Sequence, residues 1–521
     1  MSRKKTQEIG ASGFQSYLTE EGIVSITDSA KMSILGELAN GDKTLADLSR
    51  TLNIPLSTLF SNLSKMVDRG LVISYGSSDD NRKILYSLIA MKLIESVEPD
   101  PSFDEPLTDV LGKAVSDPGY FYRSIVTFVN FYSSKIGLDM GPVMEKTGAT
   151  LATVMKDDLR SDKVEEIIPK LKTYAIKAHL PDITVFTFVP LTIIMQLDYG
   201  TTSKPDNLFK LTMGFVMQAL SDHTGLSYRT SNAEVFGSDN SKFKFVLEPE
   251  SGMGEKFSKT VMGCETMSVK FDDSAEYFEL YATDRGMIYN SNMTQICILD
   301  KLRISPYTLS ELSRDLGISQ STVFSNLNKM LDSGLIAISD NQIDNRKVLY
   351  KPTSVRILTQ KAPVKGAEKK AYAAMVRATK NPETFFRSLF DFLSYGCDII
   401  GLDLSDSARL VGSEYAKAVK ENNSDCKIEG IMDKICKNSD MIGAESVTLM
   451  TYIPMTIVLS CYLDNDKSVS KMVSSFYQGF FSELISLTTD IPYVVLSSEE
   501  VREDRIVHKY VFEASNVRTV S

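Results

Sequence analysis

Apolar and polar residues alternate with helical spacing in a stretch that occurs twice along the chain. Within residues 57–66, Leu59, Leu63 and Met66 are three or four residues apart, which predicts one apolar stripe along a helix. Ser57, Thr58, Ser61, Asn62 and Lys65 would then lie on the open face of this helix, which is small, polar and singly basic. The same pattern returns in residues 321–330. An ordinary surface helix alternates in this way too, so the flanking elements must decide what the helix does.

The repeat extends over almost the whole chain. An offset of 264 aligns Phe60 with Phe324 and Gly148 with Gly412, and later in each copy the offset becomes 265, as for Gly214 and Gly479. Two domain-sized copies of roughly 250 residues indicate a fused pair rather than a solenoid. Homodimers are mostly two-fold symmetric, so the simplest expectation is a pseudo-two-fold pair within one chain.

The first part of each unit has the element order of a winged helix–turn–helix. A helix over 31–38 precedes Thr44-Leu-Ala-Asp47, which predicts a capped helix over 45–52, and Thr308-Leu-Ser-Glu311 repeats this as a capping box. A turn then leads to the helix with the apolar stripe, which is expected to end at Gly70 or Gly334. A predicted β-hairpin follows, with basic residues at the start of its return strand.

The segments Ile54–Val72 and Ile318–Ile336 resemble the recognition helices of ArsR/MarR-type regulators. The resemblance covers about 60 residues of each copy and implies double-stranded DNA as the partner. The DNA-facing residues that it implies are Leu56, Ser57, Thr58, Ser61, Asn62 and Lys65 in the first copy, and Gln320, Ser321, Thr322, Ser325, Asn326 and Lys329 in the second. It also implies that the wing residues Arg82, Lys83, Arg346 and Lys347 hold phosphates or enter the minor groove.

One departure from that family concerns arginine. Such helices often carry Arg or His where this chain has Ser61 and Asn62, so the bidentate contact to guanine is missing. Asparagine still pairs with adenine, which favours A·T-rich or shape-dependent readout. Residues 27–95 hold eight basic and eight acidic residues, whereas residues 291–361 hold nine and six. The second copy is therefore better suited to phosphate binding.

The second part of each unit combines aromatic-rich helices with strands rich in threonine and β-branched residues. It is similar to the 4-vinyl reductase domain, an α/β module that binds small molecules and serves as the sensor of some archaeal regulators. Gly214-Phe215, Gly479-Phe480 and the terminal strands carry this resemblance. Domains of that family usually have cysteines in the terminal hairpin, where this chain has Phe243 and His508. A small hydrophobic ligand and a purely dimerising role both remain open.

Composition excludes several classes of protein. The net charge of −10 is unlike that of a protein that coats DNA, and no run of 18 or more apolar residues predicts a membrane span. Six cysteines with no Cys-x-x-Cys pair, and three histidines without a repeated pattern, provide neither a metal site nor a catalytic set. We expect no enzyme activity, no cofactor and no metal. The N-terminus lacks the apolar core of a signal peptide, so a cytoplasmic, nucleoid-associated location is expected.

Together these patterns predict an α+β protein with two winged helix–turn–helix domains alternating with two 4-vinyl-reductase-like α/β domains. The expected parts are an N-terminal extension (1–26), the first winged helix–turn–helix (27–95), the first α/β domain (105–250), a linker (251–276), the second winged helix–turn–helix (277–361) and the second α/β domain (365–521). The chain is expected to act as a monomer that forms an internal pseudo-dimer, with further dimerisation left open.

The leading functional hypothesis is a transcriptional regulator that reads a pseudo-palindromic site with two heads. The alternatives are an architectural, chromatin-like DNA-binding protein with little sequence preference and a winged-helix module that binds other proteins.

Overall fold

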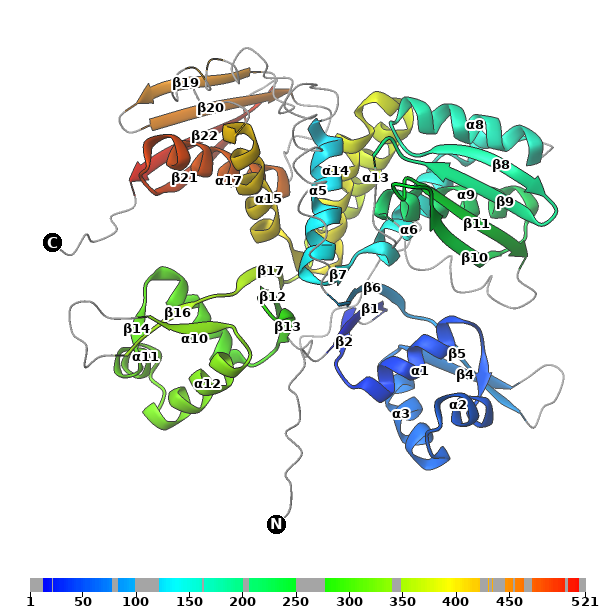
Figure 1. Ribbon diagram of the computed structural model, residues 1–521, viewed down its shortest axis with the longest axis horizontal. Coiled ribbons are helices and arrows are strands. Elements are labelled where there is room, and N and C mark those ends of the chain that lie inside the picture. Colours follow the sequence, from blue (N-terminus) through cyan, green and yellow to red (C-terminus); the bar gives the residue numbers. More distant parts are fainter. Residues whose placement is uncertain are drawn as a thin grey trace.

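The computed structural model describes most of the chain as two smaller lobes below two larger ones (Figure 1). The described residues are 13–20, 22–76, 83–98, 121–161, 164–199, 206–249, 277–339, 348–421, 446–452, 455–462, 471–501 and 505–514, with 430 and 433. Helices and antiparallel sheets occur together in it, which confirms the α+β class. The expected linker over 251–276 lies outside the described residues.

The first lower lobe contains three helices and a small three-stranded sheet. The elements of this region are β1 (Gln15–Thr19), β2 (Gly22–Ile26), α1 (Ser29–Ala39), β3 (Lys43–Thr44), α2 (Leu45–Leu52), α3 (Leu56–Asp68), β4 (Val72–Gly76), β5 (Ile84–Leu88) and β6 (Met91–Ser96). We call residues 29–88 the first head. The predicted cap is present, because the Thr44 hydroxyl accepts from the Asp47 amide at 3.1 Å and the Asp47 carboxylate accepts from the Thr44 amide at 3.3 Å. Helix α2 therefore begins at Leu45.

The second lower lobe repeats this order of elements. They are β12 (Glu279–Thr283), β13 (Gly286–Asn290), α10 (Met293–Ile304), β14 (Tyr307–Thr308), α11 (Leu309–Leu316), α12 (Gln320–Asp332), β15 (Ile336–Ser339), β16 (Leu349–Pro352) and β17 (Val355–Gln360). We call residues 293–352 the second head. The capping box at Thr308 and Glu311 is complete, and Gly317 ends α11 in the left-handed conformation. Each head has its own apolar core of buried residues.

Residues 15–26 differ from the expected N-terminal extension. They form the hairpin β1–β2, and β1 pairs with β6 in a sheet of order β2-β1-β6-β7, where β7 is Leu138–Asp139. The second unit has the matching order β13-β12-β17-β18, with β18 at Leu402–Asp403. Each of these sheets therefore joins a head to the α/β domain that follows it. This pairing was not predicted, because the partner strand β6 lies some 70 residues further along the chain.

Each α/β domain packs helices on a four-stranded antiparallel sheet. The remaining elements of the first unit are α5 (Phe121–Ile136), α6 (Gly141–Val154), α7 (Lys156–Leu159), α8 (Val164–Lys177), β8 (Asp182–Phe188), β9 (Leu191–Gln196), α9 (Asn207–Thr224), β10 (Tyr228–Phe236) and β11 (Lys242–Pro249). Those of the second are α13 (Ala367–Lys380), η4 (Pro382–Thr384), α14 (Phe385–Ile400), α15 (Ser405–Glu421), β19 (Ser446–Tyr452), β20 (Met455–Tyr462), α17 (Lys471–Thr489), β21 (Tyr493–Val501) and β22 (Arg505–Ala514). The sheet orders β10-β11-β9-β8 and β21-β22-β20-β19 correspond strand by strand.

Two glycines let the main helices of each α/β domain cross in backbone contact. A Cβ added at Gly148 of α6 would lie 1.8 Å from the Leu211 carbonyl oxygen of α9, and one at Gly214 would lie 1.9 Å from that of Glu145. Helices α15 and α17 cross in the same way at Gly412 and Gly479. No side chain fits at such a crossing, so these glycines fix how closely the helices approach.

Helices α5 and α14 join the two units into one core. Ile125 and Phe128 of α5 belong to the apolar cluster of the second α/β domain, whereas Phe385 of α14 belongs to the cluster of the first. The Tyr174 hydroxyl of α8 donates to the Ala378 carbonyl of α13 at 2.8 Å. Each unit thus completes the other's core, and α5 and α14 lie side by side between the upper lobes (Figure 1).

The buried imidazole of His508 in β22 predicts acid sensitivity. Only 2% of this side chain is exposed, and burial disfavours the charged form, which lowers the pKa of His508 to about 4. Unfolded chains take up this proton near pH 6.5, so below that value the unfolded state holds more protons and stability falls until about pH 4. We expect this histidine to cost about 3 kcal/mol of folding free energy across that window.

The variant His508→Phe has the residue that the first unit carries at the equivalent position, Phe243. It should lack this acid-dependent loss of folding free energy. Urea unfolding at pH 7 and at pH 4.5 gives the loss of folding free energy on acidification for each protein. Both proteins have the same carboxylates, so the difference between the two losses reports on His508. An identical loss of stability in wild type and variant would contradict the assignment to His508.

Candidate nucleic-acid interface

Helix α3 of the first head turns a polar face to solvent. Leu59, Leu63 and Met66 are at most 1% exposed, which confirms the predicted apolar stripe. The stripe packs α3 into the core of the first head together with residues of α1 and α2. This packing leaves the polar residues on the other side of α3 facing solvent.

The structure places the predicted DNA-facing residues of the first head as follows. Those on the exposed side of the recognition helix or at the start of the wing strand are Leu56, Ser57, Thr58, Ser61, Lys65 and Lys83. Asn62 is half-buried on the flank of α3. Arg82 lies outside the described residues.

Helix α12 of the second head has the same arrangement. Val323, Leu327 and Met330 are buried, and the predicted residues Gln320, Ser321, Thr322, Ser325 and Lys329 are exposed. The Ser319 hydroxyl caps the helix by accepting from the Thr322 amide at 3.2 Å. Arg346 and Lys347 lie outside the described residues.

Asn326 differs from the predicted DNA contact. Its side chain is only 9% exposed, its amide group donates to the Thr322 carbonyl at 2.9 Å, and its amide oxygen accepts from Gln295 of α10 at 3.4 Å. A side chain used in this way within the head is not presented to a base edge. We therefore remove Asn326 from the candidate interface. The corresponding position in α1 is Lys31, so the same partner is not available to Asn62.

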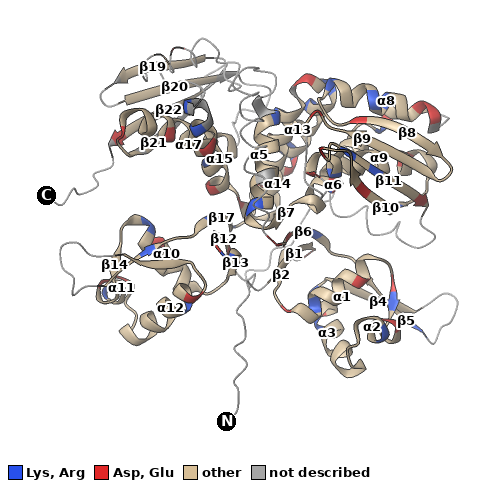
Figure 2. Ribbon diagram, in the orientation of Figure 1, with Lys and Arg blue, Asp and Glu red and all other residues tan. Residues whose placement is uncertain are grey.

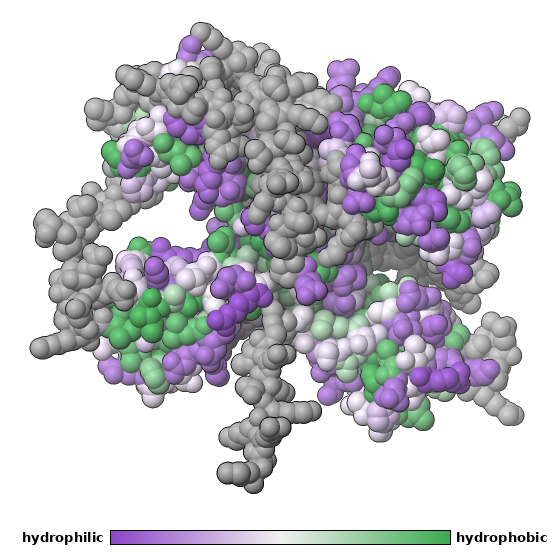
Figure 3. Space-filling view, in the orientation of Figure 1, coloured by the Kyte–Doolittle hydropathy of each residue, from purple (hydrophilic) through white to green (hydrophobic). Residues whose placement is uncertain are grey.

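One feature of this face was not predicted, namely an exposed phenylalanine in each recognition helix. Phe60 is 60% exposed and Phe324 is 50% exposed. The repeat pattern aligned these two residues but gave no reason to expect both on the surface. Hydrophobic residues are visible on the outside of both lower lobes, between hydrophilic ones (Figure 3).

Charge on the heads is distributed rather than concentrated. Basic residues are scattered over both lower lobes among acidic ones (Figure 2). Two of the exposed lysines, Lys65 and Lys329, occupy equivalent positions near the ends of α3 and α12. These two positions place a positive charge on the exposed side of each helix.

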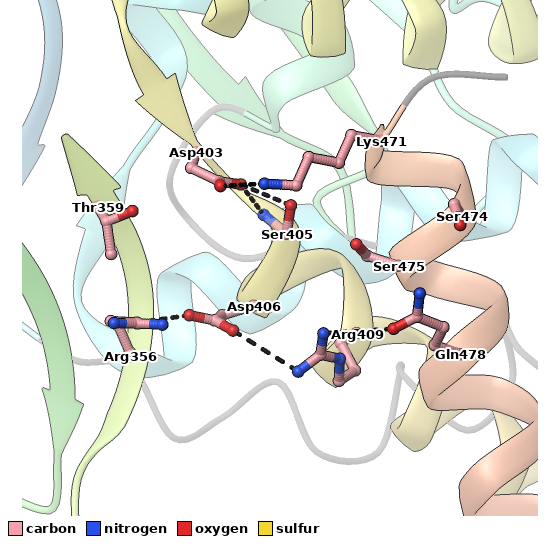
Figure 4. A pocket seen from close by; sticks show the side chains of 10 residues that line it. All are labelled: Arg356, Thr359, Asp403, Ser405, Asp406, Arg409, Lys471, Ser474, Ser475 and Gln478. Carbon is pink, nitrogen blue, oxygen red and sulfur yellow. Dashed lines mark hydrogen bonds and ion pairs between the residues drawn. The ribbon is translucent and has the colours of Figure 1, made fainter. Parts of the chain in front are cut away.

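A polar pocket of about 330 Å³ lies where the second head joins its α/β domain (Figure 4). Its lining comes from β17, β18, α15 and α17 and consists of Arg356, Thr359, Asp403, Ser405, Asp406, Arg409, Lys471, Ser474, Ser475 and Gln478. Charged and hydroxyl-bearing side chains of this kind do not suit the hydrophobic ligand considered above.

An ion-pair network crosses this pocket. Arg356 of β17 binds Asp406 of α15 at 2.5 Å and the fully buried Glu279 of β12 at 2.9 Å. Burial alone would raise the pKa of Asp403, but hydrogen bonds from Lys471 and Ser405 outweigh it and lower that pKa to about 2. The network thus ties α15 to the sheet that joins the second head to its α/β domain.

The first unit has no equivalent of this network among its aligned residues. Lys92, Pro142 and Glu145 stand where Arg356, Asp406 and Arg409 stand in the second unit. The two units therefore differ in how the head is attached, although their folds correspond.

The described residues bring together no group of three or more His, Cys, Asp or Glu side chains suited to a metal ion. Within the same residues, no helix is both long and apolar enough to cross a membrane.

Comparison with known proteins identifies one part of the chain. Residues 292–337, from the start of α10 into β15, match the family described as bacterial regulatory protein, arsR family. Neither curated proteins nor solved structures gave a match. Residues 292–337 thus form a helix–turn–helix of the type that DNA-binding transcriptional regulators carry, and DNA is the partner that this element implies.

Proposed function

We propose that this chain is a transcriptional regulator in which both heads bind one DNA site. The observation that carries the proposal is the common orientation of the recognition helices. Helices α3 and α12 both lie on the side of the heads away from the α/β domains (Figure 1). Each exposes serine and threonine hydroxyls and one lysine on that side. One DNA duplex running beneath both heads would meet both helices.

The correspondence between the units supports a pseudo-palindromic site. Recognition helices related by two-fold symmetry read half-sites about one helical turn apart, or a multiple of it. In this proposal the two units arose by duplication of a single winged-helix and 4-vinyl-reductase-like chain. Leu56 and Gln320 differ at the first residue of the two recognition helices, so the half-sites need not be identical.

The joined α/β domains would set the distance between the heads. Their shared core around α5 and α14 makes them one packed body, and the sheets containing β1 and β12 connect it to the heads. A ligand bound to the α/β domains would act by changing this packing. It would do so only if it bound two conformations of these domains with different affinities. The protein needs no catalytic step in this role.

Selection from sheared genomic DNA tests the proposal. The purified chain is mixed with the fragments at physiological salt, and the retained fragments are sequenced. We expect one compact motif with two half-sites about ten base pairs apart, or a multiple of that distance. Enrichment that follows A·T content alone would favour an architectural protein, and retention of no DNA would favour a protein-binding module.

A further inference from the structure

Phe60 and Phe324 share a position that calls for a functional reason. Each is the fifth residue of its 13-residue helix and directly follows a fully buried residue, Leu59 in α3 and Val323 in α12. Single exposed apolar residues are common on protein surfaces. Here the same aromatic residue stands at the same place on both helices and is at least half exposed in each.

Several exposed neighbours of each phenylalanine are shorter and polar. They are Ser57, Ser61 and Ser64 beside Phe60 on α3, and Ser321, Ser325 and Asn328 beside Phe324 on α12. On a helix, neighbours three and four residues apart share a face. Each ring is therefore a large apolar group beside short polar side chains on the surface of its helix.

In the first head the ring is part of a longer apolar strip. Leu56 is 52% exposed and Val67 is 36% exposed, and helical spacing places both on the same flank as Phe60. In the second head Gln320 replaces Leu56. Phe60 and Phe324 are thus the large exposed apolar side chains that helices α3 and α12 have in common.

The major groove offers one apolar group to such a side chain. Each base pair presents hydrogen-bond donors and acceptors there, and thymine adds its C5 methyl group. The exposed part of α3 carries no arginine to select guanine. A ring that meets a methyl group loses exposed apolar surface on both sides of the contact.

We propose that Phe60 and Phe324 each contact the methyl group of one thymine and so require thymine at one position in each half-site. This inference rests on the proposed function, since it needs both heads to bind DNA. It adds to that function the base recognised and the residue that recognises it.

Replacement of thymine by deoxyuridine tests the proposal, because it removes the methyl group and keeps the base pair. Duplexes of the selected motif, each with one such replacement, are titrated with the wild-type chain, Phe60→Ala, Phe324→Ala and Phe186→Ala. Phe186 is a 69% exposed phenylalanine of β8, far from the heads, and serves as the matched control. Both recognition-helix rings are exposed, so their removal leaves the cores of the heads intact.

The wild-type chain should lose about five- to tenfold in affinity at one thymine position in each half-site. Phe60→Ala should lose this response in one half-site and Phe324→Ala in the other, while Phe186→Ala behaves as wild type. DNA binding that is unchanged by every deoxyuridine would overturn the proposal and leave the proposed function standing. Failure to bind any DNA would overturn both.

Light scattering on the same proteins distinguishes the thymine contact from a role of these rings in binding another protein. The wild-type chain and Phe60→Ala should have the same mass in solution. A wild-type oligomer that Phe60→Ala dissociates, together with no response to deoxyuridine, would assign the apolar strip to a protein partner and overturn the thymine contact.

Discussion

Replacing Gly148 with alanine should destabilise the protein by about 3 kcal/mol or more. The added Cβ would lie 1.8 Å from the carbonyl oxygen of Leu211, which belongs to a helix backbone and is unable to rotate away. Helix α9 would have to move outward, and the apolar contacts between α6 and α9 would be lost along both helices. Gly412→Ala should act in the same way on α15 and α17, where the corresponding distance is 2.1 Å from the Phe476 carbonyl oxygen.

Gly396→Ala provides the control. Gly396 also lies within a helix of an α/β domain, but a Cβ at this position meets nothing within 4 Å. Alanine is the better helix former by about 1 kcal/mol, so this variant should be as stable as wild type or more stable. Guanidinium unfolding followed by circular dichroism compares the midpoints of the three variants. Equal midpoints for Gly148→Ala and Gly396→Ala would show that the helices do not cross in backbone contact.

Reversal of charge on both recognition helices should reduce DNA affinity about 100-fold at physiological salt. Lys65 and Lys329 are exposed at equivalent positions of α3 and α12, and each is expected to contact one phosphate. The double variant Lys65→Glu, Lys329→Glu loses both contacts and adds two repulsions. The slope of log affinity against log salt should become shallower by about two, since each neutralised phosphate contributes roughly 0.9.

Lys369→Glu is the matched control for this variant. Lys369 is an exposed lysine of α13 in the upper part of the molecule, so its reversal changes the net charge without touching the heads (Figure 1). Fluorescence anisotropy of a labelled duplex at four salt concentrations gives both affinity and slope. If Lys369→Glu lowers log affinity by half as much as the double variant does, the loss of affinity follows from net charge alone.

Local patterns were sufficient to predict helices α3 and α12 and their buried sides. The spacing of Leu59, Leu63 and Met66 specifies which side of α3 is buried, because helical periodicity alone decides it. The capping residues Thr44 and Thr308 likewise mark where the second helix of each head begins. Short-range rules of this kind need no knowledge of the rest of the fold.

Contacts between distant segments limited the prediction elsewhere. The hairpin at 15–26 is stabilised by pairing with β6, and the role of α5 depends on residues of the other unit more than 200 positions away. Asn62 and Asn326 both lie in the sequence Phe-Ser-Asn-Leu, but Asn326 receives a hydrogen bond from Gln295, whereas the first copy has Lys31 at the position of Gln295. The exposure of Phe60 and Phe324 was not predicted, because the repeat aligned these residues and the apolar stripe left them unassigned to either face.

Hydroxyl-radical footprinting of one selected DNA fragment tests the central claim most directly, namely that two heads of one chain bind one site. We predict two protected segments whose centres are about ten base pairs apart, or a multiple of that distance. Lys65→Glu should weaken protection of one segment and Lys329→Glu that of the other. A single protected segment that both variants weaken equally, or protection with no preferred position, would contradict the account.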